Sequence, residues 1–197
     1  MVHPVRASSL PANFRDVGEM LSIWFEPSPL PAGQLYRGGK LDPFMGPVLA
    51  VPVRTIVNLR AGPDPLLDGM RGDHHPAPAG LDRYDTHLRP VRDWVRRVLV
   101  YLVDPATPWP VYVHCASGRD RTGVIVAAVL LAIGVDREIA EQDYLLSDET
   151  DAAAIRHAID GLLAFDDWRP KQLAGPLGEA AAWLAGPCGS RASTGRE

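Results

Sequence analysis

Short runs of β-branched and aromatic residues alternate along this chain with longer stretches in which apolar residues recur at helical spacing. The run 54–60, Arg-Thr-Ile-Val-Asn-Leu-Arg, is followed by Gly62-Pro63 and predicts a buried strand. Residues 111–114, Val-Tyr-Val-His, predict a second strand, and residues 83–88 are compatible with a short third one.

The helical stretches differ in how far their apolar positions extend around the helix. In residues 92–103 the apolar side chains fall on one face, which predicts an amphipathic helix. The run after Arg121 is apolar almost throughout and predicts a buried helix. Asp136 and Asp151 suit the N-caps of two more. The expected helices cover residues 92–103, 121–133, 136–146 and 151–165.

This alternation of strands and helices predicts an α/β fold in one domain. A chain of 197 residues suits a single packed domain, which we expect to span residues 1–185. Residues 61–80 are rich in Gly, Pro and Asp and predict a long loop. Residues 186–197 are small and polar, and we expect a mobile tail there.

Composition narrows the possible functions. Hydrophobic residues make up 46% and charged residues 22% of the chain, as in ordinary globular proteins. The net charge of −4 argues against a nucleic-acid partner. The longest apolar run, 124–135, is shorter than the roughly 20 residues that a membrane span needs. We therefore expect a cytoplasmic protein without a transmembrane segment, whose anionic ligands, if any, would need a local pocket.

The candidate chemistry lies in residues 113–123, Val-His-Cys-Ala-Ser-Gly-Arg-Asp-Arg-Thr-Gly. A six-residue turn between a strand and a helix can direct successive backbone N–H groups into one anion-binding concavity, to which the helix N-terminus adds its own. Glycine permits backbone angles that other residues avoid, and a guanidinium can bind two phosphate oxygens at once. The residues expected to bind phosphate are Ala116, Ser117, Gly118, Arg119, Asp120 and Arg121.

The same positive surroundings favour the thiolate form of Cys115, which is the form that attacks as a nucleophile. Attack on phosphorus would give a phosphocysteine intermediate that water later hydrolyses. The hydroxyl of Thr122 could donate to the sulfur and help it leave, and His114 is expected to support the backbone of the loop. Cys188, the only other cysteine, has no comparable context, so a disulfide is not expected.

A buried structural cysteine is the ordinary alternative for Cys115. The pattern His-Cys-x-x-Gly-x-x-Arg-[Ser/Thr]-Gly fixes six positions, and chance would produce it in roughly one in a million chains of this length. Its position between a β-rich run and an apolar helix is also the context that the chemistry requires. The pattern therefore favours a catalytic cysteine.

This segment resembles the phosphate-binding loop of the protein tyrosine and dual-specificity phosphatase superfamily. Residues 104–115 are similar to the atypical dual-specificity enzymes of plants and fungi. Other stretches resemble a bacterial tyrosine phosphatase subgroup that can also act on phosphoinositides: 13–18, 35–39, 54–60 and 143–147. The resemblance implies a single-domain phosphatase fold, with a central, mostly parallel sheet flanked by helices, and a reaction that needs no metal or other cofactor. It implies phosphorylated proteins or phosphoinositides and inositol phosphates as substrates.

The general acid that protonates the leaving oxygen has two candidates. Asp85 precedes the cysteine by 30 residues, which resembles the acid position of small dual-specificity enzymes. Asp120 lies inside the loop, which resembles the bacterial subgroup. Asp85 could instead be a solvated carboxylate, and Asp120 could instead form an ion pair with Arg119 or another basic group. Asp82 and Asp93 are the further candidates for the acid.

Several other charged residues admit more than one interpretation. Arg119 could supply a second cation for a highly charged headgroup or be solvated. Arg15 and Arg37 could brace the loop or pair elsewhere. His74 and His75, with Asp73 beside them, are expected to be solvated rather than to hold a metal.

Three functions remain to be separated by experiment. The first is an active phosphatase for phosphotyrosine, phosphoserine, phosphothreonine or phosphoinositide substrates. The second is a binding module that holds phosphorylated ligands without turnover, for which an intact thiolate would be unnecessary. The third, a rhodanese-type or redox enzyme, would need a different loop or a resolving cysteine near Cys115. The sequence favours the first and does not define the oligomeric state.

Overall fold

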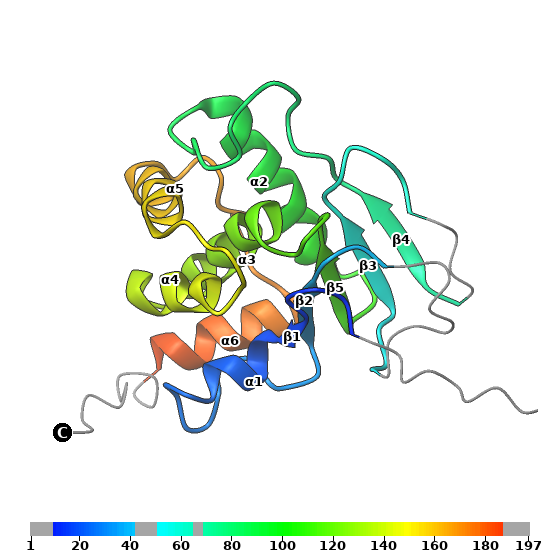
Figure 1. Ribbon diagram of the computed structural model, residues 1–197. Helices are drawn as coiled ribbons and strands as arrows, with labels where there is room; N and C mark the ends of the chain where they lie inside the picture. The colour runs from blue at the N-terminus through cyan, green and yellow to red at the C-terminus, as the bar shows by residue number, and fades with distance from the viewer. Residues whose placement is uncertain (1–9, 42–50, 65–68, 187–197) are drawn as a thin grey trace, which may run out of the picture.

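The computed structural model describes residues 10–41, 51–64 and 69–186 (Figure 1). Their five strands form one sheet in the order β1-β2-β5-β3-β4. The pair β1–β2 is antiparallel and the other three pairs are parallel. The strands are β1 (Arg15–Asp16), β2 (Leu35–Gly38), β3 (Thr55–Asn58), β4 (Arg71–His74) and β5 (Val111–His114).

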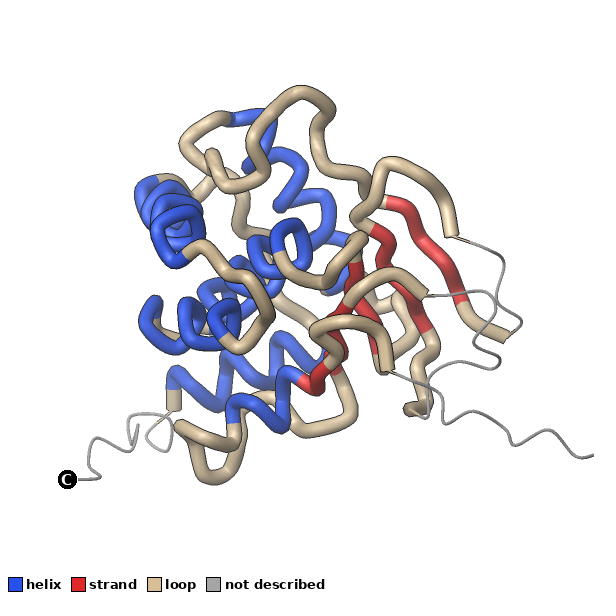
Figure 2. Tube along the Cα trace, in the orientation of Figure 1, coloured by secondary structure: helices blue, strands red, loops and turns tan. Residues whose placement is uncertain are grey.

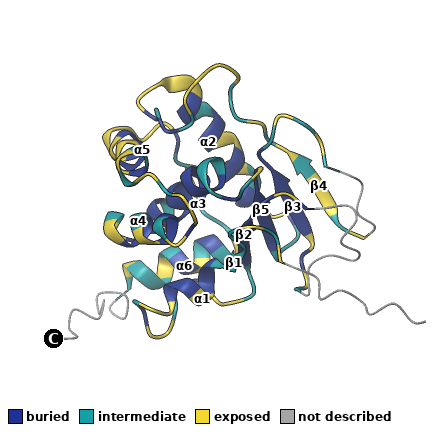
Figure 3. Ribbon diagram, in the orientation of Figure 1, coloured by how far each residue is buried: buried dark blue, intermediate teal, exposed yellow. Residues whose placement is uncertain are grey.

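The described helices gather on one side of this sheet, so that helix and strand form separate layers (Figure 2). α3 lies between the sheet and the other helices, and its residues are buried almost all the way round (Figure 3). The helices are α1 (Val17–Leu21), α2 (Arg89–Leu102), α3 (Asp120–Ile133), α4 (Arg137–Leu145), α5 (Ala152–Ala164) and α6 (Gly175–Ala185).

The two faces of the sheet carry two separate apolar clusters because neighbouring side chains on a strand point to opposite faces. On β5, Val111 and Val113 join the large core beneath the helices. Tyr112 lies between them in sequence and joins a small cluster with Tyr36 and Ile56. The central strand is therefore buried on both faces, and its carboxyl end is fixed in place.

The predicted α/β fold with a central, mostly parallel sheet flanked by helices is confirmed. The strand predicted at 111–114 is β5, and the predicted buried helix is α3. The amphipathic helix begins at Arg89 rather than at residue 92, because Pro90 suits the first turn of a helix. Asp151 caps α5 by accepting from the N–H groups of Ala153 and Ala154, as its position predicts.

Two predictions are wrong. Residues 83–88 form turns rather than a strand, because Asp82 accepts the backbone N–H of Tyr84 at 2.9 Å and holds the chain bent. The predicted loop 61–80 contains β4, a strand at one end of the sheet whose polar sequence, Arg-Gly-Asp-His, carries no β pattern. The predicted tail lies, except for Gly186, outside the described residues.

Candidate active site

The loop 115–121 connects the carboxyl end of β5 to the first turn of α3. Its tightest point is Gly118, whose φ of +73° lies in the left-handed region. A Cβ at this position would lie 2.2 Å from the carbonyl carbon of Gly38. Glycine is therefore required both by the backbone angle and by the close approach of β2.

The carbonyl groups of this loop point outward to the N-terminal part of the chain. Three successive carbonyl oxygens accept hydrogen bonds there: Ala116 from the N–H of Lys40 at 3.0 Å, Ser117 from Nδ2 of Asn13 at 2.9 Å, and Gly118 from Nη2 of Arg37 at 2.9 Å. A peptide N–H points away from the carbonyl of the same peptide unit. The N–H groups of Ser117, Gly118 and Arg119 therefore point to the opposite, inner side, and successive N–H groups that face one side are able to bind an anion.

A buried charge cluster supports the loop from below. Arg37 is completely buried and pairs with Asp143 of α4, while Nε of Arg15 lies 3.0 Å from the other oxygen of Asp143. Nη1 of Arg15 also donates to the hydroxyl of Ser147 at 3.2 Å. Burial lowers the pKa of Arg37, and the neighbouring Asp143 carboxylate opposes that shift. Arg37 thus connects β2 to both α4 and the loop, which was one of its two predicted roles. Arg15 instead pairs with Asp143 and Ser147 and makes no hydrogen bond to the loop among the described residues.

The pairing of β3 with β5 places the strand end that Arg121 contacts next to Cys115. Cys115 is 1% exposed. Nη1 of Arg121 donates to the carbonyl of Leu59 at 3.2 Å. Asn58 is paired with His114 in the parallel register, so Leu59 and Cys115 follow side by side at the ends of the two strands. The guanidinium is therefore held beside the strand end that carries the sulfur.

The first turn of α3 contains the buried hydroxyl of Thr122. Among the described residues, Oγ1 of Thr122 has no hydrogen-bond partner, and the residue is 0% exposed. The next residue, Gly123, leaves room for the ring of Tyr144, since a Cβ there would lie 2.4 Å from Cδ2 of that ring. In the Thr-Gly pair of the motif, Thr122 therefore supplies a free hydroxyl, and Gly123 lets the Tyr144 ring pack against the first turn of α3.

His114 is fully buried and bonded on both sides of its ring. Its Nε2 lies 2.7 Å from Oδ2 of Asp64, and its Nδ1 lies 3.3 Å from the carbonyl oxygen of Cys115. The ring also stacks on Tyr112, with centroids 5.5 Å apart. These contacts fix the backbone just ahead of the loop.

Asp120 lies at the start of α3 and accepts two hydrogen bonds on Oδ1, at 2.8 Å from the hydroxyl of Tyr84 and at 2.9 Å from Nε of Arg119. Nη2 of Arg83 lies 3.5 Å from the other oxygen. Burial alone would raise the pKa of Asp120, but these hydrogen bonds and the two guanidinium charges together lower it. The Tyr84 hydroxyl lies 2.7 Å from that of Tyr144, and burial with these hydrogen bonds raises the pKa of Tyr84.

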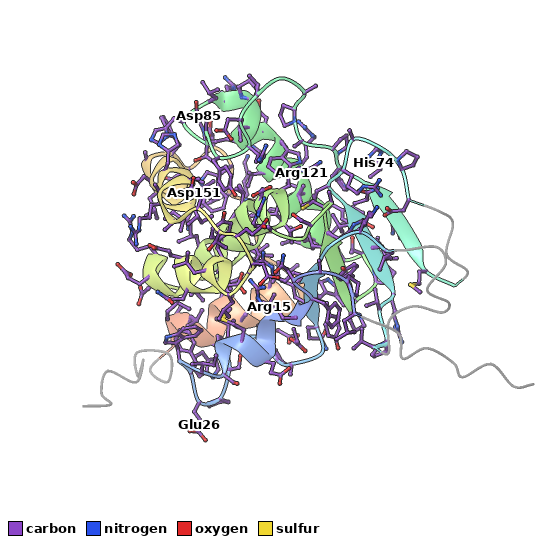
Figure 4. The ribbon with its side chains drawn as sticks, viewed as in Figure 1. Arg15, Glu26, His74, Asp85, Arg121 and Asp151 are labelled. Atoms are coloured by element: carbon purple, nitrogen blue, oxygen red, sulfur yellow. The ribbon has the colours of Figure 1, made fainter. Side chains whose placement is uncertain are left out.

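Asp85 lies in a different setting. Its carboxylate faces His87 at 3.8 Å and His157 of α5 at 3.5 Å. In Figure 4 Asp85 lies near the top of the molecule, apart from the labelled Arg121. Of the two predicted acids, Asp120 is the one that the structure brings to the loop of Cys115 and Arg121.

The remaining charged candidates pair with other groups of the protein. Nη1 of Arg119 bonds the side chain of Glu149 at 3.0 Å. Nε2 of His74 lies 2.8 Å from the carbonyl of Arg60, whereas Nε2 of His75 lies 3.4 Å from Asp73. The two neighbouring histidines therefore have different partners and do not converge on one point.

Several residues of the site were not singled out from the sequence. Tyr84 carried no signal, because its role depends on a side-chain contact across 36 residues. Asp64 is likewise placed only by the fold. Asn13, Asp143 and Ser147 lie in stretches whose resemblance to the bacterial subgroup was noted, so that signal could have found them.

Known proteins similar to this chain were found by sequence and by structure. The sequence profile of the tyrosine phosphatase family matches residues 9–173. The triple specificity protein phosphatase PtpB of Mycobacterium tuberculosis is 44% identical over 62 residues, which is 31% of this chain and only 22% of that protein.

One solved structure supports the fold, and a second one matches less closely. The core catalytic domain of the PP-IP phosphatase SIW14 from S. cerevisiae matches with a TM-score of 0.56 and 15% identity, over 86% of this chain and all of that domain. TpbA of P. aeruginosa matches with a TM-score of 0.43 and 21% identity, over 76% of this chain and 87% of its own.

The loop around Cys115 joins a buried strand to a helix, and Arg121 lies in the first turn of that helix. This arrangement is typical of the cysteine-dependent phosphatases. The profile match covers most of the chain, which therefore belongs to the tyrosine phosphatase family. Within the described residues no helix has both the length and the apolar character needed to cross a membrane.

Proposed function

We propose that this protein hydrolyses phosphate monoesters through a phosphocysteine intermediate on Cys115. The observation that carries the proposal is the orientation of the loop, whose three outward carbonyls leave the N–H groups of Ser117, Gly118 and Arg119 directed inward. An inward-facing nest at a helix N-terminus binds the oxygens of a phosphoryl group. Family membership supports the same chemistry.

In the first step the Cys115 thiolate attacks phosphorus, the S–P bond forms and the bond to the leaving oxygen breaks. Arg121 and the loop N–H groups bind the three equatorial oxygens, over which charge spreads in the transition state. Asp120 gives its proton to the leaving oxygen. In the second step Asp120 accepts a proton from water as the water attacks phosphorus, and the S–P bond breaks to release phosphate. The free hydroxyl of Thr122 donates to the departing sulfur.

Burial acts to raise the pKa of Asp120, but the hydrogen bonds from Tyr84 and Arg119 and the charges of Arg119 and Arg83 lower it. A bound phosphate brings negative charge close to Asp120 and offers these arginines a second partner. Both effects favour the protonated acid, because a nearby negative charge raises the pKa of a carboxyl group. Substrate binding would thus prepare Asp120 to act as the proton donor.

The substrates we propose are phosphotyrosine proteins first, with phosphoserine, phosphothreonine and phosphoinositides or inositol phosphates as further candidates. The names of the similar proteins, a triple specificity protein phosphatase and a PP-IP phosphatase, support this range. Arg83 and Arg119 at the rim could bind additional phosphates of a headgroup. Phosphate release from phosphotyrosine peptide, phosphoserine peptide and phosphoinositides, measured side by side, tests the range.

The central test is phosphate release from p-nitrophenyl phosphate. Cys115→Ser should abolish release and still bind tungstate, an oxyanion of phosphate shape, whereas Cys188→Ser should retain activity as the matched control. Equal activity in Cys115→Ser would overturn the proposal. Tungstate binding without any turnover by the parent protein would instead favour a module that only holds phosphorylated ligands.

A further inference from the structure

A cluster of three potential metal ligands lies outside the proposed catalytic loop. Asp85 and His87 come from the loop before α2, and His157 comes from α5. Oδ1 of Asp85 lies 3.5 Å from Nε2 of His157 and 3.8 Å from Nδ1 of His87, and one ligand atom of each residue lies within 4.8 Å of the others. We propose that these three side chains bind a divalent transition-metal ion of the Zn²⁺ type, at a site separate from the phosphatase chemistry.

The donor set and the spacing both suit such an ion. Imidazole nitrogen and carboxylate oxygen bind Zn²⁺ at about 2.0–2.2 Å in tetrahedral geometry, which places two ligand atoms about 3.4 Å from each other. The separations of 3.5 and 3.8 Å from Asp85 exceed this by about 0.1 and 0.4 Å, and ligand atoms of the two histidines lie within 4.8 Å of each other. Small rotations of exposed side chains would close them, and a water molecule would fill the fourth position.

The backbone around the cluster is already fixed. Thr86, between the two loop ligands, donates from Oγ1 to the carbonyl of Ala158 at 2.6 Å, next to the third ligand. Gly161 permits this approach, because a Cβ there would lie 2.2 Å from that hydroxyl. Arg92 donates to the carbonyls of Thr86 and His87 at 3.0 and 2.7 Å. An ion would therefore bind between elements that are already held together, at little cost in conformational entropy.

The charge around Asp85 also leaves a place for a cation. Among the described residues its carboxylate pairs with the two histidines and with no arginine or lysine. By contrast, Asp120, Asp143 and Asp167 each pair with an arginine. The side chains of Asp85, His87 and His157 are 34%, 41% and 54% exposed, so an ion can reach them from solvent. A divalent ion would therefore enter the site directly from solvent, and it would supply a positive charge beside the Asp85 carboxylate.

Zinc binding to thiolates has to be removed before this site can be measured. The double variant Cys115→Ser/Cys188→Ser, stripped of metal with EDTA, removes both cysteines of the chain. Titration of this protein with ZnCl₂ by calorimetry should give about one ion per chain, and ZnCl₂ should raise its melting temperature. His157→Ala and His87→Ala in the same background should each weaken binding at least tenfold and abolish the thermal shift.

His74→Ala is the matched control, because His74 bonds the carbonyl of Arg60 on another part of the surface and should leave zinc binding unchanged. The circular dichroism spectra of the metal-free variants should match that of the parent, which separates loss of a ligand from loss of folding. His157→Gln replaces His157→Ala if the alanine variant does not fold. No zinc binding by the cysteine-free parent would overturn the proposal. Binding by His157→Ala and His87→Ala as tight as that of the parent would also overturn it. Neither result depends on catalysis, so the proposed phosphatase activity is tested independently.

Discussion

Nη2 of Arg37 donates to the carbonyl oxygen of Gly118 at 2.9 Å, inside the protein and out of contact with water. The same guanidinium pairs with Asp143 of α4. One buried side chain of β2 thus holds both the proposed phosphate-binding loop and a helix behind it. Variants at Arg37 and at Gly118 separate the contribution of this buried side chain from that of the loop backbone.

Arg37→Met should destabilise the fold and reduce catalysis together. Asp143 is 1% exposed, and removal of one partner from a buried ion pair leaves the other charge poorly compensated. We expect the free energy of unfolding in urea to fall by about 3 kcal/mol, at the lower end of the range for buried pairs because Arg15 still contacts Asp143. The loosened loop should reduce kcat/KM by at least about tenfold.

Arg137→Met is the control for Arg37→Met, because Arg137 pairs with Asp160 at 2.8 Å on the surface, where both side chains are largely exposed. Its loss should cost less than about 1 kcal/mol and leave kcat/KM unchanged. Equal stability of the two variants would show that the buried cluster does not support the loop.

Gly118→Ala should disrupt the loop locally. The left-handed φ of +73° costs a residue with a Cβ about 1–2 kcal/mol, and the close approach of Gly38 adds a steric clash with backbone atoms. We expect a fall of more than about 2 kcal/mol in the free energy of unfolding, with loss of phosphate release. Gly72→Ala in β4 meets nothing within 4 Å and should change stability by less than about 0.5 kcal/mol. A fully active Gly118→Ala protein would contradict the geometry described for the loop.

The sequence was sufficient for the elements that are buried on all sides. α3 and β5 could be predicted because their apolar patterns reflect burial on all sides, and the Cys-to-Arg spacing then indicated the loop between them. β4 could not be predicted in the same way, because its exposed residues at one end of the sheet carry little hydrophobic signal. α6 was also missed.

The supporting residues of the site depend on register and on distant contacts. Arg37 reaches Gly118 only because β2 pairs with β5, and no local pattern gives that pairing. The choice between Asp85 and Asp120 likewise stayed open, because their partners, His157 and Tyr84, lie far along the chain from them. Sequence spacing locates a titratable group, but its protonation depends on what packs around it.

Tyr84→Phe should move the pH dependence of catalysis without removing the acid. The Tyr84 hydroxyl donates to Asp120 and is one of the causes that lower the pKa of that carboxyl group. Loss of the donor should therefore raise the pKa of Asp120. A general acid works only when protonated, so activity falls as the pH rises through its pKa. This falling limb of kcat/KM should accordingly shift to higher pH in Tyr84→Phe.

Tyr101→Phe on α2 provides the control for that shift, because Tyr101 lies beside Arg71 and His75 rather than beside the loop. Its pH profile should match that of the parent. An unchanged limb in Tyr84→Phe, or a shift to lower pH, would exclude Asp120 as the acid whose ionisation limits the rate.

Asp120→Asn and Asp85→Asn should differ most clearly on substrates with poor leaving groups. Without its acid the enzyme must expel an unprotonated oxygen, which costs about 10²–10⁴ in rate for an alcohol or phenol that leaves reluctantly. p-Nitrophenolate leaves readily without a proton, so the loss should be much smaller on p-nitrophenyl phosphate. For Asp120→Asn we therefore expect a large loss of rate on phenyl phosphate and a much smaller one on p-nitrophenyl phosphate. Asp85 faces His87 and His157, so Asp85→Asn should retain similar kcat values on both. The opposite result, with the leaving-group penalty confined to Asp85→Asn, would assign the proton to Asp85 and would require its loop to move toward Cys115 during turnover.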